Sequence, residues 1–203
     1  MEEKFREILR RENAKFNLIS RKSFEKTFDY LWLLSKQVLE TLEPFDSIVD
    51  IGSGAGFPGL AIKILSPEKK VLLVEPRKKR YEFLTLAIKE LGLTNIEVLK
   101  GDFFLFHKKF CDKKFDYLTC LGIKNKEDFV REDCNNIKKG YCFITGKNEV
   151  ERILQLKKIK KYNSEVKKVS GKDNLFLVII HRNGKNNSNS KSKRRSWKNN
   201  DRS

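Results

Sequence analysis

The sequence predicts an α/β fold in which a mostly parallel sheet is covered by helices on both faces. From Ser47 onward, short apolar runs alternate with amphipathic stretches, the pattern of strands and helices that build a parallel sheet. A glycine-rich turn joins the first apolar run to the next amphipathic stretch, as in folds that bind ligands at the ends of their strands. Near the C-terminus, two apolar runs flank a polar segment and predict an antiparallel hairpin.

The apolar runs define the expected parallel strands. They are Ile48–Ile51, Val71–Val74, Ile96–Leu99, Tyr117–Cys120 and Tyr141–Thr145. The clearest of the intervening helices is Lys78–Leu91, in which apolar residues recur at helical spacing from Tyr81 onward. Gly92 follows this helix and is a typical C-terminal stop.

Two helices are expected before the first strand. In Glu2–Phe16 the apolar residues gather near one face of a helix, and Ser23–Leu42 forms a second helix that Pro44 ends. With 203 residues, the chain is long enough for one domain with appendages. We therefore expect an N-terminal helical cap over residues 1–44 and one α/β domain over residues 45–182.

The glycine-rich turn after the first strand indicates a site for a nucleotide-type cofactor. Glycines let the backbone pass close to a ligand, and a helix starting near Pro58 turns its free N–H groups toward that ligand. The glycines satisfy two spacings. Gly52-x-Gly54-x-Gly56 is typical of S-adenosylmethionine loops, and Gly54-x-Gly56-x-x-Gly59 is typical of dinucleotide loops.

Asp50, just before the turn, separates these alternatives. Dinucleotide-binding strands usually end in apolar residues, whereas S-adenosylmethionine loops carry an acid that helps to orient the amino-acid end of the cofactor. The two preceding helices favour the same choice, because a dinucleotide domain commonly begins with its strand. We therefore expect S-adenosyl-L-methionine as the cofactor, bound by Asp50, Gly52, Gly54 and Gly56. A phosphate-binding P-loop is excluded, because no Gly-Lys-Ser/Thr ending follows the glycines.

Two further acids are expected to face the same ligand. Glu75 ends the second strand, where a carboxylate binds the hydroxyls of a ribose. Asp102 follows the third strand, where its carboxylate or backbone amide meets an adenine, and Phe103 flanks the ring. No cluster of His, Cys, Asp or Glu indicates a metal site.

The expected C-terminal hairpin narrows the fold class. Its strands are Glu165–Val169 and Leu175–His181, and residues 170–174 form its turn. A terminal antiparallel hairpin on a parallel sheet distinguishes the class I methyltransferase fold from a plain dinucleotide-binding fold. The predicted fold class is therefore α/β, a class I S-adenosylmethionine-dependent methyltransferase (Rossmann-like) sheet with helices on both faces and a C-terminal antiparallel hairpin.

The charge balance favours a polyanionic partner. The chain has 44 basic and 27 acidic residues, a formal net charge of +17, and nucleic acid is the leading candidate. Genomic bias or a thermophile's charged surface is the alternative explanation. Two groups of basic residues are candidates for contact with phosphates. They are Arg6, Arg10, Arg11, Lys15, Arg21 and Lys22 near the N-terminus, for which a solvated helical face is the alternative, and Arg77, Lys78, Lys79 and Arg80 near the expected cofactor site.

Residues 183–203 form a polar, basic segment with almost no apolar residue to bury. We expect this tail to be disordered in isolation. It is either an RNA-binding arm, in which Trp197 stacks on a base, or a solvated extension. Both interpretations remain open from the sequence.

The cysteines and the apolar runs indicate the compartment. Cys111, Cys120, Cys134 and Cys142 form no C-x-x-C pair, so we expect reduced and mostly buried thiols. No apolar run approaches the length of a transmembrane helix, and no signal segment begins the sequence. We expect a monomer in the cytoplasm that has no membrane partner.

The order of motifs resembles that of a known family. The motifs are Asn17-Leu18, Val49-Asp50-Ile51-Gly52-Ser53-Gly54-Ala55-Gly56-Phe57-Pro58-Gly59, Lys79-Arg80-x-x-Phe83-Leu84 and Leu93-x-Asn95-Ile96. Together they are similar to the ribosomal RNA small-subunit methyltransferase G family, also called glucose-inhibited division protein B. The resemblance covers roughly residues 10–182, and the tail lies outside it.

This resemblance implies a class I fold, S-adenosylmethionine as methyl donor and N7 of one guanine in 16S rRNA as acceptor. The substrate is then 16S rRNA or the small ribosomal subunit. The family's cofactor contacts correspond to Gly52, Phe57 and the pair Phe103 and Phe104. Guanine N7 carries an exposed lone pair at neutral pH, so no general base is needed and we expect no catalytic proton-transfer residue.

The sequence departs from the family pattern at two places. The family's His-x-x-Asp-Ser is replaced here by Leu31–Ser35, and its Ser/Ala-Arg-Ala after the fourth strand reads Cys120-Leu121-Gly122. The alternative function is therefore a basic RNA-binding or ribosome-assembly protein on a methyltransferase fold with weak or lost catalysis. A third hypothesis, an NAD-dependent oxidoreductase, is disfavoured by Asp50 and by the lack of a Tyr-x-x-x-Lys pair.

Overall fold

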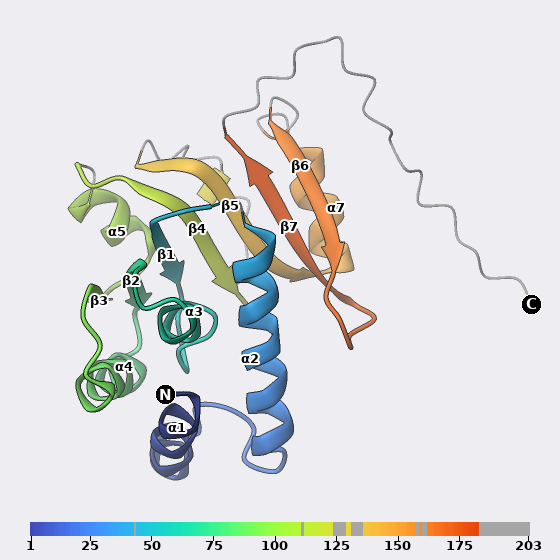
Figure 1. Cartoon of the computed structure of the whole chain (residues 1–203). Coiled ribbons are helices and arrows are strands. Elements are labelled where there is room, and N and C mark those ends of the chain that lie inside the picture. Colours follow the sequence, from blue (N-terminus) through green and yellow to red (C-terminus); the bar gives the residue numbers. More distant parts are fainter. Residues whose placement is uncertain are drawn as a thin grey trace, which may run out of the picture.

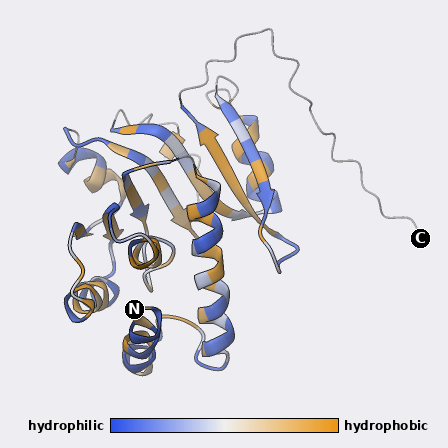
Figure 2. Ribbon diagram, in the orientation of Figure 1, coloured by the Kyte–Doolittle hydropathy of each residue, from blue (hydrophilic) through white to orange (hydrophobic). Residues whose placement is uncertain are grey.

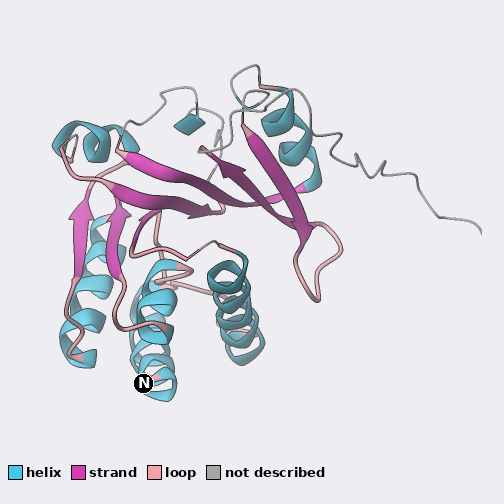
Figure 3. Ribbon diagram, turned by 45° about the horizontal axis from the view of Figure 1, so that its top comes forward, coloured by secondary structure: helices cyan, strands magenta, loops and turns pink. Residues whose placement is uncertain are grey.

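The computed structural model shows a single mixed sheet between two layers of helices (Figure 1, Figure 3). It describes residues 1–42, 44–110, 112–123, 129–130, 136–156, 159 and 162–182. The helices are α1 (Glu2–Phe16), α2 (Phe24–Thr41), α3 (Gly59–Leu65), α4 (Lys78–Leu91), α5 (Phe103–Lys109) and α7 (Lys147–Gln155). The strands are β1 (Ser47–Ile51), β2 (Lys70–Glu75), β3 (Ile96–Lys100), β4 (Phe115–Leu121), β5 (Ile137–Gly146), β6 (Asn163–Lys168) and β7 (Leu175–His181).

The seven strands lie in the order β3-β2-β1-β4-β5-β7-β6. Strands β1 to β5 pair in parallel, and Ile48 of β1 lies beside Val71 of β2 and Tyr117 of β4. Strand β7 is antiparallel to both β5 and β6, so the expected C-terminal hairpin is confirmed. Strand β7 lies between β5 and β6, which places the hairpin at one edge of the sheet.

Each face of the sheet has its own hydrophobic core because side chains alternate along a strand. Ile48 of β1 packs with the helices α1 to α4, and its neighbour Val49 packs on the opposite face with α5 and α7. Strand β7 is hydrophobic along most of its length, whereas the edge strand β6 is mostly hydrophilic (Figure 2). The predicted cover of helices on both faces is therefore confirmed.

The N-terminal helices pack through a cluster of aromatic rings. Phe5 of α1 lies 5.7 Å from Phe28 of α2 and 5.5 Å from Phe57 of the glycine turn, measured between ring centroids. Trp32 stacks on Phe28 at 5.8 Å. The cap is thereby joined to the same core as α3 and α4.

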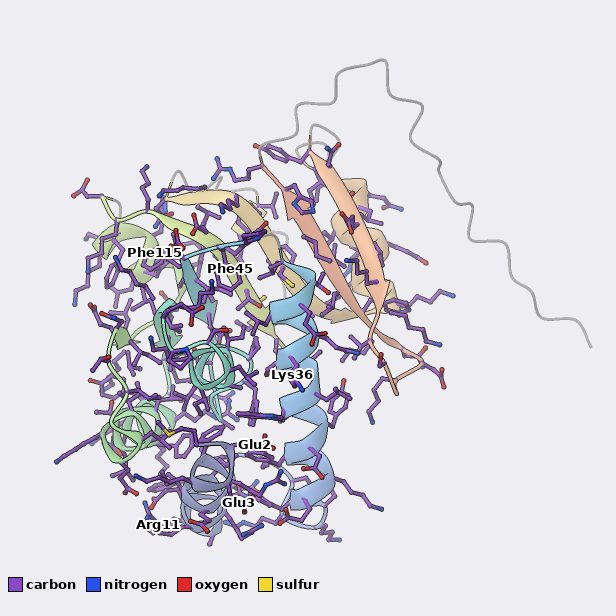
Figure 4. The ribbon with its side chains drawn as sticks, in the orientation of Figure 1. Glu2, Glu3, Arg11, Lys36, Phe45 and Phe115 are labelled. Carbon is purple, nitrogen blue, oxygen red and sulfur yellow. The ribbon has the colours of Figure 1, made fainter. Side chains whose placement is uncertain are left out.

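Most of the N-terminal basic residues are engaged within the protein. The guanidinium of Arg6 lies over the ring of Phe28 and contacts the carboxylates of Glu25 and Asp29 on α2, the latter at 2.7 Å. The other contacts are Arg10 with Glu25, Arg11 with Glu12 and Glu90, Lys15 with Glu12, and Arg21 with the carbonyls of Asn13 and Ala14. Glu2, Glu3 and Arg11 are labelled on α1 in Figure 4. These contacts hold α1 on α2 and α4, which differs from the phosphate contacts considered from the sequence.

Two of the cysteines lie in the described part of the chain. Cys120 and Cys142 are buried thiols, and burial raises the pKa of the Cys142 thiol to about 12. Cys111, Cys134 and the predicted tail lie outside the described residues. None of the helices in the described part is both long and apolar enough to cross a membrane.

Candidate cofactor-binding site

A cavity of about 460 Å³ lies at the carboxyl ends of the central parallel strands. It is lined by Ile51, Gly52, Glu75, Pro76, Arg77, Arg80, Asp102, Phe103, Phe104, Leu121, Gly122, Ile123 and Phe129. These residues lie at or after the carboxyl ends of β1, β2, β3 and β4, and the strand order reverses between the neighbouring strands β1 and β4. Open α/β sheets bind their ligands at this kind of switch point.

A larger cavity of about 590 Å³ lies at the opposite, amino ends of the parallel strands. Ser47, Lys70 and Phe115, which begin β1, β2 and β4, line it. Figure 4 labels Phe115 and Phe45 at these ends. Size alone does not identify a ligand site, and the smaller cavity is the better candidate because the carboxyl ends of the strands and the glycine turn meet there.

The glycine turn closes one side of the smaller cavity. Gly52, Gly54 and Gly56 have φ angles of 76°, 55° and 93°, in the left-handed region that favours glycine. The N–H of Gly52 donates to the carbonyl of Val74 at 2.7 Å, which ties the turn to β2. A Cβ atom at Gly52 would lie 2.6 Å from Cδ1 of Ile123, so any side chain there competes for the cavity.

Glu75 connects the end of β2 to the glycine turn. Its Oε2 accepts a hydrogen bond from the N–H of Gly54 at 2.9 Å, and its Oε1 accepts one from the N–H of Arg77 at 2.9 Å. The side chain lines the cavity although the residue is only 2% exposed. A carboxylate has about four lone-pair positions, so Glu75 retains acceptor capacity for two vicinal hydroxyls of a ligand.

Asp50 lies beneath the glycine turn and outside the cavity lining. The residue is 0% exposed, and its Oδ2 accepts a hydrogen bond from the N–H of Gly59 at 3.1 Å. Its Oδ1 has no hydrogen-bond partner among the described residues. Burial raises the pKa of Asp50 to about 7, and the negative charge of Glu75 acts in the same direction.

Three other predicted contacts of the glycine turn also lie outside the cavity lining. The backbone of Gly54 supports Glu75, and a Cβ atom at Gly56 would contact Leu60 at 3.0 Å. The ring of Phe57 is buried and packs against Phe5 and Phe28. Gly54, Gly56 and Phe57 therefore shape the turn from below, and direct contact between them and a cofactor stays a prediction.

The segment after β3 forms the opposite wall of the cavity. Asp102 caps α5, and its Oδ1 accepts a hydrogen bond from the N–H of Leu105 at 2.9 Å. Phe103 is buried and lies 4.4 Å from Phe129, measured between ring centroids. Phe104 also lines the cavity, but it is 62% exposed.

The basic segment after β2 divides into two pairs. Arg77 and Arg80, three residues apart, line the cavity, and Arg80 reaches over the backbone of Gly54. Lys78 contacts Glu82 at 3.8 Å, and Lys79 lies over the ring of Phe16. Only the arginines of this segment are therefore in position to meet a ligand in the cavity.

The described residues show no metal-binding group of three or more His, Cys, Asp or Glu side chains. The cavity instead offers hydrogen-bond acceptors on Glu75 and Asp102, two guanidinium groups, and aromatic and aliphatic surface. This combination suits a nucleoside that carries a polar or charged extension.

A family model described as rRNA small subunit methyltransferase G matches residues 2–181. The chain belongs to the rRNA small subunit methyltransferase G family. The match covers every described helix and strand, including the N-terminal cap. The family resemblance inferred from the sequence motifs is thereby confirmed.

Curated members of the rRNA small subunit methyltransferase G family align with most of the chain. The protein of that name from Borreliella burgdorferi is 30% identical over 179 residues, which cover 84% of each chain. The one from Mycoplasmopsis pulmonis is 30% identical over 192 residues, 87% of this chain and 81% of the relative. The member from Syntrophomonas wolfei is 38% identical over 120 residues, which are 59% of this chain and only 56% of that relative.

Solved structures support the class I methyltransferase fold. TrmK of M. capricolum, in complex with S-adenosyl-homocysteine, gives a TM-score of 0.59 with 16% identity over 74% of this chain and 68% of that chain. A mutant of MtNAS in complex with S-adenosylmethionine gives a TM-score of 0.59 with 20% identity over 85% of this chain and 71% of that chain. The predicted fold class is confirmed, and at these identities the likeness concerns the fold alone.

The family departure after β4 lies within the cavity wall. Leu121 and Gly122 line the cavity at the place of the family's arginine. The cationic groups of the wall come instead from Arg77 and Arg80 of the segment after β2. Ile123 and Phe129 also line the cavity and were missed by sequence reasoning, although the switch point between β1 and β4 is a signal for this loop.

Proposed function

We propose that this chain binds S-adenosyl-L-methionine in the cavity of about 460 Å³ and methylates N7 of a guanine in small-subunit rRNA. The observation that carries the proposal is Glu75, a buried carboxylate at the end of β2 that supports the glycine turn and faces the cavity. The family match and the methyltransferase fold support the reaction class.

The residues of the cavity fit the parts of this cofactor. The free acceptor positions of Glu75 suit the two ribose hydroxyls, and Asp102 with the ring of Phe103 suits the adenine. The turn at Gly52 leaves room for a ligand because its backbone carries no side chain. The volume also lies within the range of about 300–1,000 Å³ that is typical of small-molecule sites.

Bound S-adenosyl-L-methionine supplies a methyl group on a positively charged sulfur. The chain has to hold guanine N7 in line with this methyl group, and orientation alone is worth about 7–11 kcal/mol in favourable cases. Guanine N7 needs no deprotonation, so no residue is assigned to proton transfer. The side chain of Ile123 lies against Gly52, and Leu121 and Phe129 add apolar surface to the same cavity wall.

The proposed substrate is 16S rRNA, either free or within the small ribosomal subunit, and the proposed compartment is the cytoplasm. An A-form helix hides N7 in a deep and narrow major groove. The target guanine is therefore expected in a loop or in a partly exposed strand. The proposed oligomeric state is a monomer.

The test is incubation of the full chain with labelled S-adenosyl-L-methionine and either free 16S rRNA or purified small subunits that lack the modification. Transfer of label to the RNA is expected, and comparison of the two substrates identifies the preferred one. The control is Gly52→Arg, which fills the cavity beside Ile123 and should abolish cofactor binding while RNA affinity remains. Equal methylation by this variant would refute the placement of the cofactor.

A second candidate function is RNA binding or ribosome assembly with weak or lost catalysis. The observation that favours it is the lack of an arginine at Leu121 and Gly122 in the cavity wall. Tight binding of small-subunit RNA without any label transfer, to free RNA or to the subunit, would support this candidate over the enzyme.

A further inference from the structure

The side chain of Phe104 at the cavity is exposed, whereas Phe103 and Phe129, which line the same cavity, are buried. Of the 15 phenylalanines in the chain, Phe104 is the one that the structure leaves exposed, at 62% of its surface. Its neighbour Phe103 is 3% exposed and meets the Phe104 ring edge to face at 5.6 Å. Phe104 therefore has a ring face in solvent at the rim of the cavity, and Phe103 supports it from behind.

The arginines of the same rim lack protein partners in the described part of the chain. No hydrogen bond or ion pair of the Arg77 or Arg80 guanidinium is found among these residues, whereas Lys78 on the same helix contacts Glu82. Both acids of the cavity wall are already engaged, since Glu75 accepts from backbone N–H groups and Asp102 caps α5. The rim thus presents two guanidinium groups beside an exposed ring, while both carboxylates of the wall are held by backbone N–H groups.

We propose that Phe104, Arg77 and Arg80 form a binding surface for the RNA strand next to the target guanine. This inference rests on the proposed function, because it assigns a surface at the same cavity. The Phe104 ring stacks on a nucleobase, and the two guanidinium groups contact the adjacent phosphates. An exposed aromatic ring on a rim that also carries cationic groups is the combination that binds single-stranded nucleic acid, in which the bases are free to stack.

The family resemblance implied a cofactor contact for both Phe103 and Phe104, and the present proposal replaces that expectation for Phe104 because the two rings differ in burial. A ring that flanks the adenine of a cofactor inside the cavity is expected to be covered, as Phe103 is. The exposed face of Phe104 is available to a group that comes from outside the cavity. The high net charge of +17 agrees with a polyanionic partner at this rim.

The first experiment compares Phe104→Ala and Phe104→Trp with the control Leu33→Ala. Leu33 is also an exposed apolar side chain, but it lies on α2, which packs on the other face of the sheet. Fluorescence anisotropy measures the affinity for a labelled single-stranded RNA of about 12 nucleotides, a length within the usual site size. Calorimetry measures the affinity for S-adenosyl-homocysteine. Phe104→Ala should weaken RNA binding about 5- to 150-fold, the factor for about 1–3 kcal/mol of stacking.

Phe104→Trp should retain RNA affinity, and neither variant should change the affinity for S-adenosyl-homocysteine. Unchanged RNA binding by Phe104→Ala would overturn the proposal. An equal loss of S-adenosyl-homocysteine affinity would also overturn it and assign the ring to the cofactor. A loss of affinity for whole subunits but not for free RNA would contradict base stacking and indicate a protein contact.

The second experiment measures the salt dependence of RNA binding for Arg77→Ala, Arg80→Ala and the matched control Lys78→Ala. Each arginine variant should lower the slope of log affinity against log salt by about one, because one phosphate contact is lost. Lys78→Ala should leave the slope unchanged, and equal slopes for all variants would contradict the phosphate contacts. These measurements need no methyl transfer. If RNA binding depends on Phe104 but no methylation occurs, the proposed function is refuted and the proposed RNA-binding surface is retained.

Discussion

The Oε2 atom of Glu75 accepts a hydrogen bond from the backbone N–H of Gly54 at 2.9 Å. One carboxylate thereby fixes the glycine turn to the end of β2 and faces the cavity beside it. The turn and the expected ribose-binding group are therefore one structural unit. A change in either residue should affect both cofactor affinity and local stability.

Replacing Glu75 by Gln should weaken cofactor binding and destabilise the turn. The amide of Gln keeps a single acceptor oxygen, so one of the N–H donors of Gly54 and Arg77 would face an NH₂ group. An unsatisfied buried donor costs about 1–3 kcal/mol. Calorimetry with S-adenosyl-homocysteine and denaturant unfolding measure the two effects. Wild-type affinity in a folded Glu75→Gln variant would show that this carboxylate does not hold the cofactor.

The variants Gly52→Ala and Gly92→Ala should separate backbone strain from loss of cavity space. Both glycines have positive φ angles, 76° and 64°, so each alanine should lower the free energy of unfolding by about 1–2 kcal/mol. A Cβ atom at Gly92 meets no atom within 4 Å, whereas one at Gly52 lies 2.6 Å from Ile123. Only Gly52→Ala should therefore lose cofactor affinity, as measured by calorimetry. Equal affinities of the two variants would place the cofactor elsewhere.

Asp50 should make stability fall as pH rises. Burial raises the pKa of Asp50 from 3.8 to about 7 in the folded chain, so the folded state keeps a proton that the unfolded state releases. This contribution is fully present below about pH 4 and is lost between about pH 4 and 7, with a size on the order of 4 kcal/mol. Asn at position 50 cannot ionise, and its oxygen still accepts from the N–H of Gly59.

The measurement for Asp50 is the free energy of unfolding of the wild type and of Asp50→Asn from pH 4 to pH 8. The stability of Asp50→Asn relative to the wild type should increase with pH through this window and level off above pH 7. A difference that stays constant with pH would show that Asp50 has an ordinary pKa in the folded chain.

Arg6→Ala should destabilise the protein more than Arg10→Ala. The Arg6 side chain is 14% exposed and contacts two carboxylates of α2 and the face of Phe28. The Arg10 side chain is 49% exposed and contacts Glu25, and such surface pairs contribute about 0–1 kcal/mol. We expect a loss of about 1–3 kcal/mol for Arg6→Ala by denaturant unfolding. Similar losses for the two variants would contradict a special role of Arg6 in docking α1.

The sequence predicted the local structure closely because each element carries its own pattern. The bounds of α1, α4 and β7 are as predicted, and Gly92 ends α4 in the left-handed conformation. Long-range pairing has no such local signal. The order of β6 and β7 was not predicted, although β7 is apolar along most of its length and β6 is polar, a difference that favours β7 as the inner strand beside β5.

Site residues were predictable from the sequence where the fold class fixes their position. They were not predictable where the packing of distant segments determines what surrounds a side chain. Glu75 and Asp102 line the cavity because both follow strands of the parallel sheet. Phe57 is adjacent to the glycine turn in sequence, but the cap covers its ring with Phe5. The charges of α1 likewise gave no indication that acids on α2 and α4 engage them. The individual cofactor contacts stay predictions.

The most direct test of the proposed function is to map the methyl group on the RNA. Small-subunit RNA is methylated by the full chain, reduced with borohydride and cleaved with aniline, a sequence that breaks the strand at N7-methylguanine. Primer extension then locates the break. The proposal predicts one break at a single guanine that depends on S-adenosyl-L-methionine and is missing with Gly52→Arg. Incorporated label without cleavage would place the methyl group on another atom, and no label at all would contradict an enzyme.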